Sequence, residues 1–339
     1  MGKLEVVEAT ASDIEELVVV HAAIDRELSP DLPPIGPDEL ALLLFQYPDR
    51  RPQRTWLARV DGVPAGTLKL MLPAHANVTH AEPLALVAPE HRRRGVATAL
   101  LHTALDAVAV DRTIVSAWVE TPAGAAFSER VGLTNRQDIR NGRLIVADVD
   151  AEQQRRWIDD APGRDAGYRI VSWRGPAPEE HIDAICAAFD AMADTPLDDL
   201  DFDIPVTTPE ILRDGERSSQ GMFEPFGSLA LDADGAPAGI TELEVNLHRP
   251  VTAQQGDTAV VPAHRGHGLG RWLKAANFAQ VLAAHPDLRY VTTYNAATNP
   301  HMLAINDEMG FGPYKSFRAC QGDLPAALAA LDELRAARA

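Results

Sequence analysis

The sequence has few cysteines and no long apolar run. Two cysteines, Cys186 and Cys320, occur in 339 residues, which is too few for a disulfide framework or a cysteine-based zinc site. No apolar stretch approaches the roughly 20 residues that a membrane-spanning helix requires. The N-terminal residues alternate charged and apolar side chains, unlike the apolar core of a signal peptide. We therefore expect a reduced, cytoplasmic protein with no membrane partner and no bound metal.

The chain also lacks the surplus of positive charge that nucleic-acid binding requires. Its formal net charge is −18, from 31 lysines and arginines against 49 aspartates and glutamates. Because proteins that bind nucleic acid present a basic face, we expect no such partner. An acidic surface serves solubility, and it also favours cationic small molecules such as amines as partners.

Two short motifs occur twice, with the same separation. DGVPAG at 61–66 returns as DGAPAG at 234–239, 173 residues later. An R-x-x-G-x-[GA] motif shows the same separation, with RRRGVA at 92–97 and RGHGLG at 265–270. A chain of this length is longer than one hydrophobic core usually serves. Two motifs in one register therefore indicate a duplicated domain.

Each half shows the same order of expected elements. A strand, an amphipathic helix and a hairpin around the D-G turn come first, and a further strand then runs into the glycine motif and a long helix. We expect domains at 1–150 and 168–320, joined by a polar linker at 150–167. The expected fold class is α/β, of the α+β kind, with a mixed but mostly antiparallel sheet flanked by helices in each domain.

The glycine motif predicts an anion site in each half. Where a strand enters a helix through glycines, the N–H groups of the first helical turn have no acceptor, and the helix dipole favours negative charge. Glycine lets the backbone approach a ligand closely, and arginine adds a charge-assisted contact. No G-K-[ST] follows, and the spacing is not G-x-G-x-x-G, so neither a P-loop nor a Rossmann turn is indicated. The motif predicts a pyrophosphate cradle.

Both halves resemble the GCN5-related N-acetyltransferase (GNAT) family, whose signature is [QR]-x-x-G-x-[GA] between a strand and a helix. The second half is also similar to a later family motif, in YNAATNPHMLAINDEMGF at 294–311. The resemblance covers nearly the whole chain as a tandem pair, and it implies acetyl-CoA as co-substrate. The residues that it assigns to this co-substrate are Val260, Val261, Arg265, Gly266, His267, Gly268, Leu269, Gly270, Arg271 and Asn299, and in the first half Arg92, Arg94, Gly95 and Ala97.

The two halves differ around the later motif. Asn295, Asn299 and Asn306 lie near a short helix that in the family runs beside the CoA arm, whereas the matching stretch at 119–133 contains no asparagine. We expect the second domain to be catalytic, and the first to bind acyl-CoA without turnover or to be structural. Asn299 is equally suited to be a helix N-cap, because asparagine is a leading N-cap residue.

The family often protonates the departing thiolate with a tyrosine, and this sequence has Asn306 at that position. Asparagine can donate a hydrogen bond to sulfur but is not a proton acid. Tyr314 and Tyr294 are substitutes by proximity, or packed aromatic residues. A thiol of pKa about 8.5 leaves tolerably as thiolate, so an acetyltransferase remains the first interpretation. The alternative is an acyl-CoA-binding sensor or pseudoenzyme without turnover.

Three acidic residues are candidates for the base that deprotonates the acceptor amine. Glu242 and Glu244 lie two apart on an expected strand and so face the same side, and Asp257 precedes the strand that enters the cradle. Glu244 and Asp257 are the preferred pair, although a solvated sheet face or a turn would use the same residues. The aspartate-rich stretch at 193–205 either recognises a basic acceptor or faces water. We expect a small-molecule amine as partner.

Overall fold

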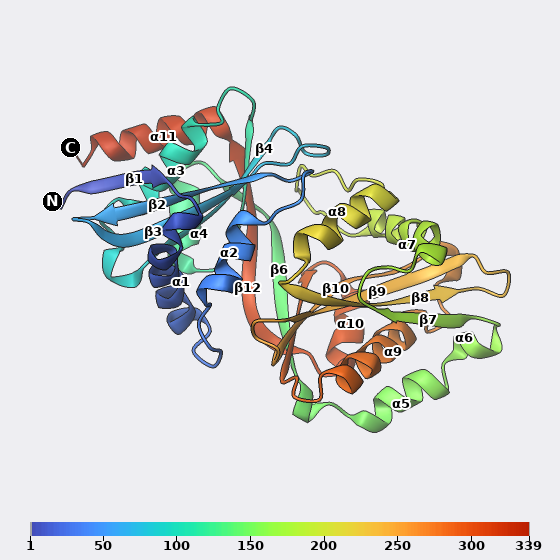
Figure 1. Ribbon diagram of the computed structural model, residues 1–339. Helices are drawn as coiled ribbons and strands as arrows, with labels where there is room; N and C mark the ends of the chain where they lie inside the picture. The colour runs from blue at the N-terminus through green and yellow to red at the C-terminus, as the bar shows by residue number, and fades with distance from the viewer. Residues whose placement is uncertain (1, 339) are drawn as a thin grey trace. The chain divides into compact units, whose positions relative to one another are not determined.

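The computed structural model describes residues 2–338, and these divide into two compact units (Figure 1). Within the described residues, unit 1 comprises 2–137, Asp199–Asp203 and 317–338, and unit 2 comprises Asp138–Asp198 and Ile204–Ser316. The units differ from the contiguous ranges 1–150 and 168–320, because each half of the chain gives its last strand to the other unit.

Unit 1 is built on a sheet with strand order β1-β2-β3-β4-β5-β12. Neighbouring strands run antiparallel, except for the parallel pair β4–β5. Its strands are β1 (Leu4–Glu8), β2 (Gln53–Val60), β3 (Val63–Met71), β4 (His80–Val87), β5 (Ile114–Val119) and the C-terminal part of β12 (Gly312–Asp323). Residues 318–323 of β12 complete the sheet by pairing with β5.

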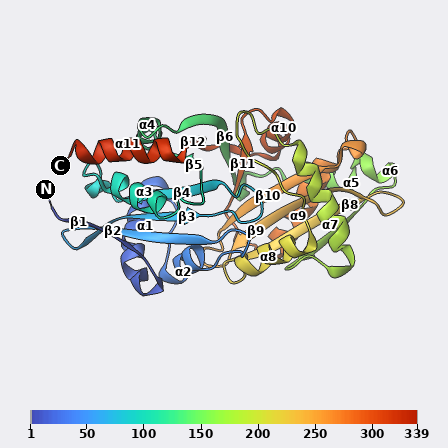
Figure 2. The same cartoon turned by 90° about the horizontal axis from the view of Figure 1, so that it is seen from above.

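Helices cover both faces of the unit 1 sheet. Leu57 of β2 packs with α1 and α2 on one face, and the adjacent Trp56 packs with α3 and α11 on the other. Figure 2 shows α11 lying along α3, as their contacts require. The helices are α1 (Ile14–Leu28), α2 (Pro37–Phe45), α3 (Val96–Asp106), α4 (Pro122–Arg130) and α11 (Leu324–Ala336).

Unit 2 repeats this arrangement, with β6 in the place that β12 takes in unit 1. The strand order is β7-β8-β9-β10-β11-β6, and only β10–β11 is parallel. The mixed, mostly antiparallel sheet that the sequence predicts is therefore confirmed in each unit. The strands are β6 (Thr134–Ile145), β7 (Arg169–Arg174), β8 (Phe223–Leu231), β9 (Pro237–Asn246), β10 (Thr252–Val260) and β11 (Tyr290–Ala296).

The helices of unit 2 also lie on both faces of its sheet. Ile240 of β9 packs with α7 and α8, and Leu243 packs on the opposite face with α9. The helices are α5 (Ala151–Asp159), α6 (Pro162–Asp165), α7 (Ile182–Phe189), α8 (Pro209–Ser219), α9 (Leu269–Ala284) and α10 (Pro300–Met309). Between residues 2 and 338, no helix is both long and apolar enough to cross a membrane.

The segment 150–167, for which the sequence predicts a linker, forms helices α5 and α6 of unit 2. The Asp150 carboxylate accepts hydrogen bonds from the N–H groups of Glu152 and Gln153, which starts α5. Helix α5 packs against α9, and Trp157 joins the core beside Phe278. The segment is therefore part of the fold of unit 2, as α11 is part of unit 1.

Candidate active site

The glycine motif of unit 2 forms the expected turn between a strand and a helix. Gly266 and Gly268 have φ values of 87° and 70°, a backbone conformation that glycine adopts without the steric penalty of a Cβ. Helix α9 begins directly afterwards, at Leu269. The Arg265 Nε donates a hydrogen bond to the Val260 carbonyl at 3.2 Å, which fixes the start of the turn. The N–H groups of the first helical turn are thus presented to a ligand.

Unit 1 contains the same turn. The Arg92 Nε donates to the Val87 carbonyl at 3.2 Å, Gly95 has a φ of 88°, and α3 begins at Val96. One difference is that Arg93, with a φ of 62°, occupies the position of Gly266. A side chain in this conformation is uncommon and strained. The internal repeat therefore extends from sequence to backbone geometry.

The two central strands of unit 2 separate next to the cradle. Strands β10 and β11 pair only between Thr252–Gln254 and Tyr290–Thr292. Beyond this point β11 continues along β6, while β10 pairs with β9 alone. The edge of β10 that faces away from β9 therefore leaves main-chain groups available beside the cradle. An extended ligand arm can bind such an edge as a further strand would.

A large cavity opens at this separation. Its volume is about 660 Å³, within the range of small-molecule sites. It is lined by Ala191, Met192, Asp194, Thr195, Pro196, Thr258, Ala259, Val260, Arg265, Gly266, Gly268, Leu269, Gly270, Arg271, Thr298, Asn299, Pro300, His301, Met302, Ala304 and Ile305. The cradle, the free edge of β10 and the start of α10 thus surround one space.

Eight of the ten co-substrate residues expected in the second half line this cavity. Two do not: the Val261 N–H is bonded to the Ala238 carbonyl, and the His267 ring packs on Tyr168 at 5.2 Å. Asn299 does line the cavity and is also the N-cap of α10, since its Oδ1 accepts from the Met302 N–H at 3.2 Å. The N-cap role of Asn299 is therefore confirmed, and its contact with the co-substrate stays a prediction that its place in the cavity allows.

Sequence reasoning missed part of one wall of the cavity. Ala191, Met192 and Asp194 belong to a 3₁₀-helix, Asp190–Asp194, that follows α7. Asp194 lies in the aspartate-rich stretch at 193–205, but no local motif marks Ala191 and Met192, because their place beside the cradle depends on how α7 packs on the sheet. Ile305 of α10 was also missed, and its helical periodicity next to Met302 was the available signal.

Both arginines of the cavity are paired with acids. The Arg265 guanidinium donates to the Asp194 carboxylate at 2.7 Å, and Arg271 pairs with Glu308 through two hydrogen bonds of 2.6 and 2.7 Å. These side chains are about half exposed, so each pair contributes little to stability and can be exchanged. Arg92 of unit 1 is paired in the same way with Glu27.

The three acidic candidates lie together in unit 2. Glu242 and Glu244 share the face of β9 that packs on α7, and Asp257 lies in a bulge of β10, where the register shifts between Gln255 and Thr258. Burial, and then the charges of Asp257 and Glu244, raises the pKa of Glu242 to about 8. Burial also raises the pKa values of Glu244 and Asp257. Carboxylates whose protonation changes near neutral pH can act as general bases.

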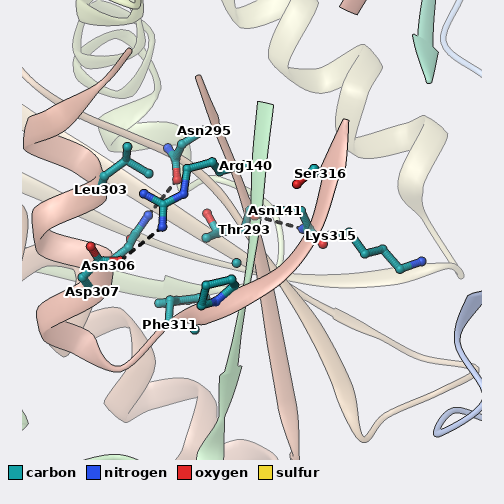
Figure 3. A pocket seen from close by; sticks show the side chains of 13 residues that line it. Arg140, Asn141, Thr293, Asn295, Leu303, Asn306, Asp307, Phe311, Lys315 and Ser316 are labelled. Carbon is teal, nitrogen blue, oxygen red and sulfur yellow. Dashed lines mark hydrogen bonds and ion pairs between the residues drawn. The ribbon is translucent and has the colours of Figure 1, made fainter. Parts of the chain in front are cut away.

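Asn306 and Tyr314 lie outside the large cavity. Asn306 lines a separate pocket of about 60 Å³, where its Nδ2 donates to Asn295 Oδ1 at 2.7 Å and its buried Oδ1 has no partner among the described residues (Figure 3). The Tyr314 ring lies under Arg143, 4.0 Å from the guanidinium carbon, and its hydroxyl is buried. Glu242, Glu244 and Asp257 do not line the large cavity either, although Asp257 is next in the chain to Thr258, which does.

The chain is similar to known acetyltransferases. Residues 21–132 match the acetyltransferase (GNAT) family. A mycothiol acetyltransferase of Saccharomonospora viridis is 30% identical over 234 residues, which cover 67% of this chain and 69% of the relative. That of Nocardia farcinica is 28% identical over 312 residues, 90% of this chain and 91% of the relative. The chain belongs to the GNAT family.

A solved structure extends the similarity to the tandem form. The "Tandem GNAT protein from the clavulanic acid biosynthesis pathway" has a TM-score of 0.77 and 28% identity, covering 95% of this chain and 99% of that structure. This protein is accordingly a tandem GNAT acetyltransferase, in which both units carry the family's cradle. GNAT enzymes use acetyl-CoA as co-substrate.

Proposed function

We propose that unit 2 transfers the acetyl group of acetyl-CoA to an amine of a small, cationic acceptor. The observation that carries the proposal is the position of the carboxylates. Asp257 directly precedes Thr258, which lines the cavity, and Glu242 and Glu244 are the charges that face Asp257. None of the three carboxylates lines the cavity itself, so the proposal requires that the amine is held beside Thr258, where it would lie between the thioester and the base.

The residues of the cavity fit acetyl-CoA. The cradle offers unpaired helix N–H groups to a pyrophosphate, and Arg265 and Arg271 offer guanidinium groups once their carboxylate partners are displaced. The free edge of β10 at 258–260 offers main-chain groups to the pantetheine amides. Bound acetyl-CoA would supply the acetyl thioester, and residues of unit 2 would orient and deprotonate the acceptor.

The carboxylates suit a cationic acceptor in two ways. A carboxylate that is ionised attracts an ammonium group, and the positive charge of a bound ammonium group in turn favours the ionised form of its neighbours. A carboxylate with a pKa near 8 can then take the proton that the amine must lose before it attacks. We assign this role to the group formed by Glu242, Glu244 and Asp257 as a whole, because interacting carboxylates titrate together.

A second candidate function is acyl-CoA binding without turnover. The positions of Asn306 and Tyr314 favour it, because neither lines the cavity where a leaving thiolate would form. The two candidates share the cofactor and differ in the need for the carboxylates. A sensor binds acetyl-CoA equally well without them, whereas a transferase loses its rate.

The similar proteins leave the acceptor open. Two relatives are named for mycothiol acetylation, and the tandem structure is named for clavulanic acid biosynthesis. Both kinds of protein are less than a third identical to this chain. We carry over from them the acetyl transfer and a small-molecule acceptor, and we take the cationic character from the carboxylates of unit 2.

The proposal is tested by release of CoA in the presence of an amine panel. The chain's own thiols, Cys186 and Cys320, are buried, so a thiol reagent reports free CoA with little background. We expect release that depends on a primary amine and falls about 10²–10⁴-fold in Glu242→Gln. Glu210→Gln, at an exposed acid of α8, is the matched control. Acetyl-CoA binding without release by any amine would support the sensor instead.

A further inference from the structure

Lys69 of unit 1 occupies the position that Glu242 occupies in unit 2. Each is the third residue after the last glycine of the repeated D-G motif, Gly66 or Gly239. Those glycines pair with equivalent residues, Gly66 with Val87 and Gly239 with Val260. The duplicated sheet therefore carries a cation in one unit at the point where the other carries an acid.

The charge of Lys69 has no counter-ion in the described part of unit 1. No carboxylate lies in hydrogen-bond or ion-pair contact with its amine among residues 2–338. Glu82, an acid on the neighbouring strand, is paired with Arg51. Burial, and then the charge of Arg51, lowers the pKa of Lys69 to about 8. A half-buried ammonium group without a partner is costly, and an anion supplied from outside would remove that cost.

A buried hydroxyl lies next to Lys69. Thr55 of β2 is its direct cross-strand partner, so the two side chains share one face of the sheet. Thr55 is 3% exposed, and its Oγ1 has no hydrogen-bond partner among the described residues. Native proteins leave few buried polar groups unpaired, and those that remain call for an explanation.

The other polar groups nearby do not neutralise Lys69. The Thr67 Oγ1 is bonded to His21 Nε2 at 3.2 Å. Burial, and then the charge of Lys69, lowers the pKa of His21 to about 4, so the imidazole is neutral at physiological pH. Neither group supplies the negative charge that Lys69 lacks.

The region is open on one side. Leu84, opposite Lys69 on β4, is 38% exposed. Strand β4 pairs with β5 only at His80 and Ala81, so the two strands separate here as β10 and β11 do in unit 2. A ligand can approach Lys69 from this opening.

We propose that unit 1 binds a carboxylate at Lys69 and Thr55, and that this site is the counterpart of the amine site of unit 2. A carboxylate has two acceptor oxygens, which match one ammonium and one hydroxyl donor. The carboxylate belongs either to a free small acid or to the far end of a dicarboxylic acyl group on CoA. The site is independent of catalysis in unit 2, so either proposal can fail alone.

The test is protection of Lys69 from reductive methylation, followed by mass spectrometry on the full chain. The sequence has four lysines, at 3, 69, 274 and 315, so each is followed separately. At pH 8 we expect succinate or succinyl-CoA, at ten times its Kd, to slow labelling of Lys69 about tenfold. Labelling of the exposed Lys3 should stay unchanged. Acetyl-CoA and sodium chloride at equal ionic strength are the control ligands.

The arms of the experiment distinguish the two sources. Protection by succinate identifies a free acid, and protection by succinyl-CoA alone identifies an acyl group. Calorimetry should show that Lys69→Met loses this ligand, while Lys3→Met keeps it. If Lys69→Met does not fold, the protection experiment on the natural chain still decides. Labelling of Lys69 that no carboxylate slows, or that chloride slows equally, would overturn the proposal.

Discussion

The guanidinium of Arg265 is bonded to the carboxylate of Asp194 at 2.7 Å. The arginine expected to contact the CoA pyrophosphate is therefore already paired with an acid of the cavity wall. Arg92 and Glu27 form the same kind of pair in unit 1. In both units, an anion that binds the arginine must therefore compete with a carboxylate.

This pairing predicts that Asp194→Asn strengthens acetyl-CoA binding. An exposed ion pair contributes about 0.2–1 kcal/mol, so its removal should lower Kd by up to about fivefold at low salt. Calorimetric titration at two salt concentrations measures the effect, which should shrink as salt screens the charges. Asp159→Asn, in α5, is a control at an acid that does not line the cavity. Weaker binding in Asp194→Asn would show that Asp194 assists the ligand.

Glu242 predicts an alkaline rise in the rate of acetyl transfer. Its pKa of about 8 means that the carboxyl is protonated, and inactive as a base, through most of the neutral range. We expect kcat/KM to rise with pH to a plateau above about 8. Glu242→Gln should lower the plateau of kcat/KM and abolish its rise with pH. If kcat/KM of Glu242→Gln still rises with pH in the same way, the base is another group.

The same residue predicts a pH dependence of stability. Between the ordinary value of 4.5 and about 8, the folded state keeps a proton on Glu242 that the unfolded chain releases. The free energy of unfolding therefore falls as pH rises through this window. Glu242→Gln should show higher thermal stability than the natural chain at pH 9, with a smaller difference at pH 5. Equal differences at both pH values would contradict the raised pKa.

The exchanged strands predict that residues 1–150 do not fold alone. This fragment lacks residues 318–323, which pair with β5, and it lacks Leu324 and Leu331, which lie in the core beside α3. We expect no cooperative thermal unfolding of this fragment. A chain in which 1–137 is joined by a flexible linker to 317–339 should recover it. A cooperative transition in 1–150 alone would show that the last strand is dispensable.

The cradle could be predicted from the sequence because its determinants are local. The positive φ of Gly268 and the start of α9 at Leu269 follow from a few neighbouring residues. The strand exchange could not, since strand pairing depends on contacts between residues far apart in the chain. The helix at 151–159 is marked by Asp150, a good N-cap, but its polar composition is equally typical of a linker.

The cluster of three carboxylates, Glu242, Glu244 and Asp257, was predicted only in part. The two-residue spacing of Glu242 and Glu244 placed them on one face, as the structure confirms. The bulge that brings Asp257 to them is not encoded by a local pattern, and their burial depends on how α7 and α8 cover the sheet. The resemblance to GNAT enzymes suggested a proton donor at 306, but the Asn306 side chain is bonded to Asn295 outside the cavity.

A calorimetric titration of acetyl-CoA into the natural chain and into Gly270→Trp tests whether the cavity of unit 2 binds the co-substrate. A Cβ at Gly270 would lie 3.1 Å from the Ile305 side chain and 3.9 Å from Val260, and Gly270 lines the cavity, so we expect the indole to fill part of it. Ala97→Trp, at the equivalent position of unit 1, is the matched control. We expect that Gly270→Trp stays folded and loses a binding site that Ala97→Trp keeps. Unchanged affinity and stoichiometry in Gly270→Trp would contradict it.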